Sequence, residues 1–183
     1  MGYLKESDLY RMGVKNIGKN VLISDKCSLY VDYLEIGNNV RIDDFCVLTG
    51  QIRLGNNIHI GAYSALYGKY GIIMEDFTGL SPRCTIFSAS DDFSGDYLIS
   101  PMTPDDYTNV TGGCVILRKF SQVGSGAVIM PEVVVNEGAV VGAMSFIKRD
   151  IPSFEIWGGN PVHYIKKRNS GLVKLSEDYI NGL

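Results

Sequence analysis

The chain has 183 residues, of which 45% are hydrophobic and 20% charged, and its formal net charge is -3. This composition is typical of a globular protein with one sizeable core and argues against a disordered chain. The negative charge argues against a nucleic-acid partner, and without a run of about 18 apolar residues we expect no membrane insertion.

The N-terminal segment, residues 1–16, is predicted to form a short helical cap. Leu4, Leu9 and Met12 would make its apolar side. The segment lacks the long apolar stretch of a signal peptide, so we expect a cytoplasmic protein.

A six-residue repeat starts at Ile17 and runs through most of the chain. An aliphatic residue recurs at every sixth position, and a small or apolar companion follows four places later. An upstream run has these aliphatic residues: Ile36, Ile42, Leu48, Leu54, Ile60 and Leu66. Its companions are Val40, Cys46, Ile52, Ile58, Ser64 and Tyr70. Gly and Asn pairs between them suit tight corners, because both tolerate a left-handed backbone.

A downstream run repeats the pattern more cleanly. Its aliphatic residues are Leu117, Val123, Ile129, Val135, Val141 and Ile147. Its companions are Ser121, Ala127, Val133, Ala139 and Ser145. A helix would repeat its apolar positions about every 3.6 residues, so the six-residue period predicts a hexapeptide parallel β-helix instead. The expected fold is therefore all-β, a triangular prism with three strands in each turn.

The repeat is interrupted twice. Between Leu66 and Ile86 the register slips, through Ile73 and Leu80, which predicts bulges at a corner. Over residues 88–113 no six-residue spacing survives, and Ser, Asp, Thr, Gly and Pro dominate. A loop this long inside a compact domain is more often functional than idle.

The predicted β-helix spans residues 17–149 and is followed by a C-terminal turn and helical cap over 150–183. Pro161 after Asn160 is a typical helix start, with Val162 and Ile165 as an apolar stripe. The final segment, from Leu172, is predicted to be a further helix or strap.

Three of the four cysteines, Cys27, Cys46 and Cys84, occupy companion positions and are predicted to point inward. There is no CxxC pair, which argues against a structural zinc site or a redox motif. We expect no metal, and inward-facing thiols would be poor nucleophiles.

The repeats, the loop and the closing Gly-Gly-Asn-Pro turn together resemble the hexapeptide-repeat acyltransferases. The nearest branches are similar to galactoside, maltose and xenobiotic acetyltransferases and to acyltransferases of surface-polysaccharide synthesis. The resemblance implies a left-handed parallel β-helix, a homotrimer, and acetyl-CoA as acyl donor in the groove between neighbouring prisms. It implies transfer of an acetyl group to a hydroxyl of a small-molecule sugar.

The same resemblance suggests the residues that hold acetyl-CoA. In the family the pantetheine arm meets backbone groups of the last repeats, which correspond here to Ala127 and Ala143. Basic side chains near the C-terminal turn meet the nucleotide phosphates, because guanidinium and ammonium groups combine several donors with charge. The residues in the matching places are Arg149, His163, Lys166 and Arg168.

The catalytic base is where the sequence departs from the family. The family's loop histidine is absent, and Ser90 or Asp91 stands in its place. Of the two histidines in the chain, His59 lies between inward-pointing Ile58 and Ile60, so strand alternation turns it outward. His59 is therefore the first candidate for general base, since a neutral imidazole accepts protons near neutral pH.

The loop supplies further candidates. Asp91 is the second candidate base, and either it or Asp92 is expected to orient His59 or to bind sugar hydroxyls. Ser90 and Tyr97 are further candidates for substrate contacts.

Three alternatives remain at the level of sequence. One is an N-acetyltransferase acting on an amino sugar, with or without a linked nucleotide. A second is a scaffold subunit without catalysis, against which the long loop and the basic C-terminal turn both argue. The third is the γ-type carbonic anhydrase class, but two histidines per chain fit its three-histidine zinc site poorly.

Overall fold

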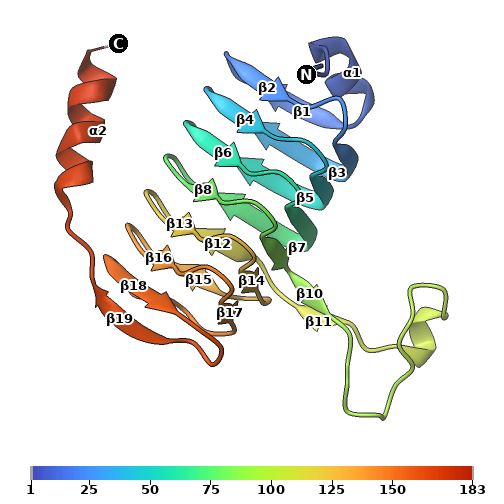
Figure 1. The fold of residues 1–183 in the computed structure, drawn as a ribbon. Helices are drawn as coiled ribbons and strands as arrows, with labels where there is room; N and C mark the ends of the chain where they lie inside the picture. Colours follow the sequence, from blue (N-terminus) through green and yellow to red (C-terminus); the bar gives the residue numbers. More distant parts are fainter. Residues whose placement is uncertain (1, 183) are drawn as a thin grey trace.

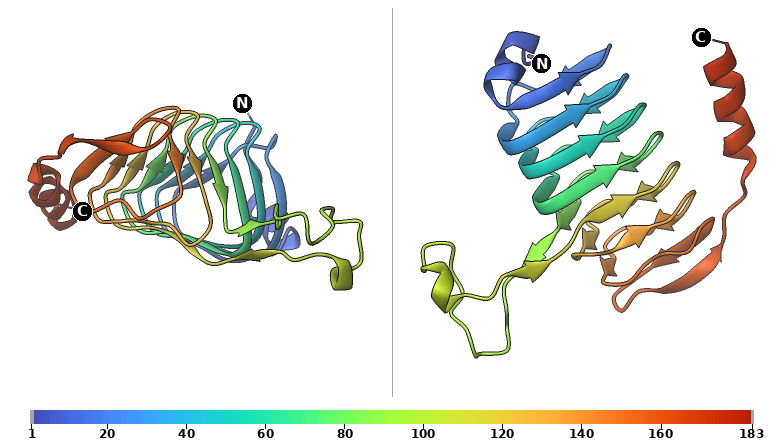
Figure 2. Two further views of the ribbon diagram at one scale, coloured as in Figure 1. Left: turned by 90° about the horizontal axis from the view of Figure 1, so that it is seen from below. Right: turned by 180° about the vertical axis from the view of Figure 1, so that it is seen from behind.

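The computed structural model describes residues 2–182, and in it the six-residue pattern forms a parallel β-helix (Figure 1). Each turn of the chain contains strands that meet at corners, and each strand pairs with a strand of the next turn. The turns follow one another along a single axis, so the molecule is a prism with three faces (Figure 2, left).

The first face of the prism is an eight-stranded sheet, parallel except at its C-terminal edge. Parallel pairing of successive turns places residues one turn apart side by side, such as Arg41 and His59. Its strands are β2 (Val21–Ile23), β4 (Val40–Ile42), β6 (Ile58–Ile60), β8 (Gly79–Leu80), β13 (Gln122–Val123), β16 (Val140–Val141), β18 (Glu155–Gly158) and β19 (His163–Lys167).

A nine-stranded sheet makes the second and third faces. Three long strands bend at the corner between the two faces: β3 (Ser28–Ile36), β5 (Val47–Leu54) and β7 (Ala65–Met74). Their first halves continue on the second face into β9 (Thr85–Phe87), β14 (Val128–Ile129) and β17 (Phe146–Ile147). Their second halves lie on the third face with β1 (Val14–Ile17), β12 (Val115–Leu117) and β15 (Val134–Val135).

The predicted interior is confirmed by burial. Every aliphatic position of both runs is at most 3% exposed, and so is every companion except Tyr70, which is 42% exposed. The predicted position of Tyr70 is wrong because the chain bulges at residues 69–71 and shifts the register of β7. Ile72 and Met74 therefore point inward, and Ile73 points outward.

The residue types that occupy the corners differ from one edge of the prism to another. Asn20, Asn39 and Asn57 adopt the left-handed backbone at one edge, as the sequence predicts, and their amides hydrogen-bond in a ladder. At the edge between the first and second faces, Phe45 and Tyr63 take the same conformation. Their rings stack with centroids 4.9 Å apart and are about half exposed.

The loop of residues 88–113 leaves the prism after β9. Its stem is a two-stranded antiparallel ribbon, β10 (Ala89–Ser90) with β11 (Thr111–Gly112), and it carries the 3-10 helix η1 (Asp105–Tyr107). Figure 2 (right) shows the loop projecting away from the stacked turns. The interruption of the repeat is therefore a structured excursion.

Both ends of the prism are capped. The helix α1 (Glu6–Arg11) covers the N-terminal turn through buried Leu9. The predicted helix after Pro161 is wrong: residues 163–167 form β19, which pairs antiparallel with β18 and closes the other end. The β-branched and aromatic residues of this segment favour a strand, and pairing satisfies the backbone groups of the last turn.

The predicted C-terminal helix is present as α2 (Gly171–Asn181). It runs back along the prism (Figure 1). The Tyr179 ring there meets the Phe77 ring edge-on, with centroids 6.2 Å apart. Within residues 2–182, no helix is long and apolar enough to cross a membrane.

Candidate active site

The projecting loop covers a hollow beside the second face. Its volume is about 820 Å³, and its floor includes Tyr67 and Phe87, whose rings stack with centroids 5.1 Å apart. Loop residues Asp91 and Thr108 line it from the other side. A smaller hollow of about 290 Å³ shares Phe87 and Asp91 with it. We call the two together the loop hollow.

Asp91 lines both parts of the loop hollow. Its carboxylate has no hydrogen-bond or ion-pair partner among the described residues. The backbone carbonyl of Asp91, by contrast, accepts a hydrogen bond from Ser90 Oγ at 3.0 Å. Ser90 lines the smaller part. A carboxylate keeps its full acceptor capacity in such a position, so Asp91 is free to bind a ligand group.

Asp92, the next residue, holds the loop together. Its Oδ1 accepts a hydrogen bond from the Ser94 backbone N–H at 2.7 Å, and its Oδ2 accepts one from Asn109 Nδ2 at 2.7 Å. The hydrogen bonds with Ser94, followed by the one from Asn109, lower the pKa of Asp92. Tyr97 is 46% exposed and lies outside the lining of the loop hollow. The hydrogen bonds of Asp92 indicate a structural role. Within one chain, Tyr97 does not contact the loop hollow.

His59 points outward from β6, as predicted, with Ile58 and Ile60 buried on either side. Its Nε2 lies 2.7 Å from Asp43 Oδ2, and Arg41 Nε donates to Asp43 Oδ1 at 2.7 Å. Partial burial acts to raise the pKa of Asp43, but the hydrogen bonds from His59 and Arg41 outweigh it and lower that pKa. We call Arg41, Asp43 and His59 the first-face trio.

The two predicted bases do not meet within one chain. His59 lies on the first face, whereas Asp91 follows β10 at the foot of the loop. The carboxylate that orients His59 is Asp43, so the expectation that Asp91 or Asp92 does so is wrong for a single chain. The signal for Asp43 was available in the sequence, because Arg41 and His59 are one turn apart and Asp43 follows Arg41 by two residues.

The Gly-Gly-Asn-Pro turn stacks on the preceding turn of the prism. Gly159 N–H donates to Ser145 Oγ at 2.9 Å, and the Asn160–Pro161 peptide bond is cis. Ala143 is exposed at this edge, whereas Ala127 is fully buried. The N–H of Ala127 donates to Gly124 O, and its carbonyl accepts from Thr85 N–H, so both backbone groups are engaged within the prism.

The C-terminal cations fall into two groups. Arg149, His163 and Lys166 are exposed near the closing hairpin, and the Arg149 guanidinium lies 5.7 Å from the Trp157 ring centroid. Arg168 instead donates from Nη1 to Phe120 O at 2.8 Å and to Gly138 O at 3.0 Å. Its burial lowers its pKa. These contacts indicate that Arg168 anchors the C-terminal segment.

The four cysteines are free thiols. Cys46 and Cys84 are fully buried, as predicted, and Cys27 is half-buried. Burial raises the pKa of Cys84 to about 11, which keeps it protonated and unreactive. Across residues 2–182 no cluster of His, Cys, Asp and Glu side chains is arranged to hold a metal ion.

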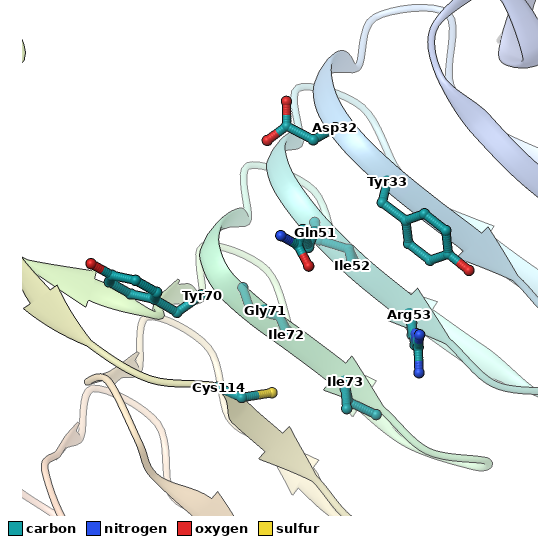
Figure 3. Close-up of a pocket in the computed structure, with 10 residues that line it drawn as sticks. All are labelled: Asp32, Tyr33, Gln51, Ile52, Arg53, Tyr70, Gly71, Ile72, Ile73 and Cys114. Carbon is teal, nitrogen blue, oxygen red and sulfur yellow. The ribbon is translucent and has the colours of Figure 1, made fainter.

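Sequence reasoning missed a second hollow, on the third face beside the loop (Figure 3). Tyr33, Gln51 and Arg53 line it from β3 and β5, Tyr70 lines it from β7, and Cys114 lines it from the residue just after the loop. The register slip at residues 69–71 was its signal, because it moves Tyr70 from the core to the surface.

Comparison with known proteins gives the class to which this fold and site belong. No protein-family profile matches the chain. The dTDP-4-amino-4,6-dideoxy-D-glucose acyltransferase of Escherichia coli is 41% identical over 179 residues, covering 96% of this chain and 93% of the relative. The predicted all-β, left-handed β-helix and the family resemblance are both confirmed. The chain belongs to the hexapeptide-repeat acyltransferases.

Solved structures agree with this assignment. A variant of AntD, an N-acyltransferase from Bacillus cereus in complex with dTDP and coenzyme A, has 42% identity and a TM-score of 0.94, with full coverage of both chains at 100%. AntD in complex with dTDP and 3-hydroxybutyryl-CoA has 43% identity and a TM-score of 0.93, covering 98% of this chain and 97% of that one.

Proposed function

We propose that this protein transfers an acyl group from acyl-CoA to the amino group of a dTDP-linked 4-amino-4,6-dideoxyhexose. The observation that carries the proposal is the loop hollow with the unpartnered Asp91 carboxylate, in a chain similar over its whole length to enzymes that act on such a sugar. N-acylation, the alternative in the sequence analysis, is better supported than the main expectation of O-acetylation.

The missing loop histidine favours an amine acceptor. A sugar hydroxyl is a weak nucleophile until a base removes its proton, so O-acyl transfer depends on a strong general base. A neutral amine already carries its nucleophilic lone pair. An enzyme for an amino sugar therefore needs a group that accepts a hydrogen bond and later a proton, and a carboxylate such as Asp91 is sufficient.

The reaction we propose is direct transfer in a ternary complex. The amine nitrogen attacks the thioester carbonyl carbon, a C–N bond forms, and backbone N–H groups stabilise the oxyanion. Collapse of this intermediate breaks the C–S bond and releases the thiolate of CoA. The nitrogen loses one proton to Asp91, and Asp91 passes this proton to the thiolate, so that CoA leaves as the thiol and the carboxylate is regenerated.

We propose that acyl-CoA, the acyl donor, binds at the exposed C-terminal edge of the prism. Ala143 offers backbone groups there, and Arg149, His163 and Lys166 offer charge to the nucleotide phosphates of acyl-CoA. Ala127 and Arg168 have their polar groups engaged inside the prism, so we expect them to support this edge through packing.

We also propose that the active unit is a homotrimer in the cytoplasm, where acyl-CoA is supplied. Phe45, Tyr63 and Met144 are 47%, 56% and 76% exposed along the edge between the first and second faces. Arg83 and Gly126 stand at the corner positions between Tyr63 and Met144, so the exposed large side chains lie at both ends of this edge. Large apolar groups exposed along one edge are typical of a surface covered by other copies. The trimer is testable by light scattering during gel filtration.

The activity is tested by incubating the purified protein with acetyl-CoA or 3-hydroxybutyryl-CoA and a dTDP-linked 4-amino-4,6-dideoxyglucose. The N-acyl product is followed by mass spectrometry, because the free thiols of the protein would disturb a thiol-release assay. The matched control is the same nucleotide sugar with a hydroxyl in place of the amine.

We expect product only from the amine. Equal acylation of the hydroxyl control would instead support O-acyl transfer as the function. A thermal shift assay in which neither CoA nor the sugar nucleotide stabilises the protein would favour the scaffold.

A further inference from the structure

The hollow on the third face is a separate feature from the loop hollow and has the size of a ligand site. Its volume is about 490 Å³, within the range of small-molecule pockets. Asp32, which Figure 3 shows in the lining of this hollow, also lines the loop hollow, so the two hollows adjoin at Asp32. A ligand long enough to turn the corner at Asp32 would therefore occupy both.

Tyr70 presents a fixed aromatic surface at one end of this hollow. Its backbone N–H donates to Ser88 Oγ at 2.9 Å, and its hydroxyl donates to Val110 O at 3.1 Å. It is thereby tied to both the beginning and the end of the loop, yet 42% of it remains exposed. A ring that is already immobilised loses little conformational entropy when a ligand stacks on it.

Two polar side chains of the hollow have no partner among the described residues. Neither the Gln51 amide nor the Asp32 carboxylate has a hydrogen bond or ion pair with any described residue. Arg53, by contrast, is held by Glu35 at 3.4 Å and lies 5.6 Å from the Tyr33 ring centroid. An amide offers a donor and an acceptor together, which complements the carbonyl and N–H edge of a pyrimidine imide.

The floor of the hollow depends on a glycine. Gly71 has a φ of +100°, and a side chain there would meet Cys114 Sγ at 3.4 Å. Gly71 lines the hollow beside Tyr70 and adds no side chain to it. Aromatic side chains beside a hollow are the usual platforms for nucleobases, because every base has a π-face.

We infer that the third-face hollow binds the pyrimidine nucleoside of the acceptor, an inference that rests on the proposed function. The base stacks on Tyr70 and pairs with the Gln51 amide, and Asp32 accepts a hydrogen bond from the deoxyribose hydroxyl. The diphosphate turns the corner toward Lys69, which lines the loop hollow, and the amino sugar reaches Asp91. One acceptor thus spans both hollows.

The first test is binding of dTDP, measured by isothermal titration calorimetry without any acyl donor. We expect the dissociation constant to rise about tenfold or more in Tyr70→Ala and severalfold in Gln51→Ala. Tyr70→Phe keeps the ring and loses the bond to Val110, so it should stay close to wild type. Tyr10→Ala, an exposed tyrosine of α1, is the matched control.

A second test needs no substitution. Cys114 lines the hollow and is half-buried, as is Cys27 on the other side of the prism. Saturating dTDP should slow alkylation of Cys114 by iodoacetamide severalfold and leave Cys27 unchanged, as read by peptide mass spectrometry.

Wild-type affinity for dTDP in both alanine variants, or no protection of Cys114 at saturation, would overturn the inference. These readouts are independent of turnover. Protein that binds dTDP through Tyr70 but acylates no amino sugar would contradict the proposed function alone.

Discussion

The first-face trio and the loop hollow both contain carboxylates on the surface of the same prism, but their partners differ. Asp43 is bonded on both oxygens, to Arg41 and His59, at 2.7 Å each. Asp91 has no side-chain partner among the described residues and faces a hollow. A carboxylate whose acceptors are filled by its neighbours stabilises the fold, whereas one that is left open can serve a substrate.

The largest expected effect is on Asp91. Asp91→Asn removes the proton acceptor while keeping the shape of the side chain, so kcat/KM for the amino sugar should fall about a hundredfold. Steady-state kinetics by mass spectrometry would measure it, with CoA binding as the check that the fold is intact. Unchanged kcat/KM would show that Asp91 is not the proton acceptor.

The next effect concerns the neighbouring residue Asp92. Asp92→Asn weakens the bonds to Ser94 and Asn109 that tie the loop together, so KM should rise by about fivefold with a smaller change in kcat. Asn109→Ala should reproduce this result, because it removes the same bond from the other side. A loss of kcat as large as that of Asp91→Asn would mean that Asp92 contacts the reacting groups.

A smaller effect is expected at His59. Within one chain it lies away from Asp91, so His59→Ala should change kcat by less than about threefold. Both kcat and the thermal unfolding temperature of the variant are measured. The unfolding temperature should fall slightly, because Asp43 loses a hydrogen-bond partner. A fall in turnover of about a hundredfold with normal stability would show that a second copy brings His59 to the amine, as a general base.

The smallest expected effect is the pH dependence of the trio. The folded-state pKa of Asp43 is lowered below its ordinary value of 3.8, so its ionised form stabilises the fold above that value. This contribution is lost as the pH falls through the lower, folded-state pKa. The stability difference between wild type and Asp43→Asn should therefore be constant near neutral pH and shrink below about pH 4. A difference that grows in acid would contradict this sign.

Sequence patterning predicted the interior well and the site in part. Ile58 and Ile60 alternate around His59, and this local rule placed all three correctly. Asp91 was singled out because it stands where the family has a histidine; the structure places it in the loop hollow, and its part in the reaction stays a prediction. Asp43 and Tyr70 were missed, since their surroundings depend on residues one turn away and on the bulge at residues 69–71. The strand β19 was missed because the Asn160–Pro161 signal for a helix is weaker than pairing with β18.

The six-residue repeat is enough to predict the β-helix and its buried positions. The six-residue period is a local property, and each turn needs only its neighbour to form. The tertiary structure decided which polar groups remained without partners. His59, one turn along the prism, pairs with Asp43, and the loop stem holds Asp91 over a hollow where its carboxylate has no hydrogen-bond or ion-pair partner among the described residues. Those outcomes depend on contacts between separate turns and on the path of the loop, which the repeat does not encode.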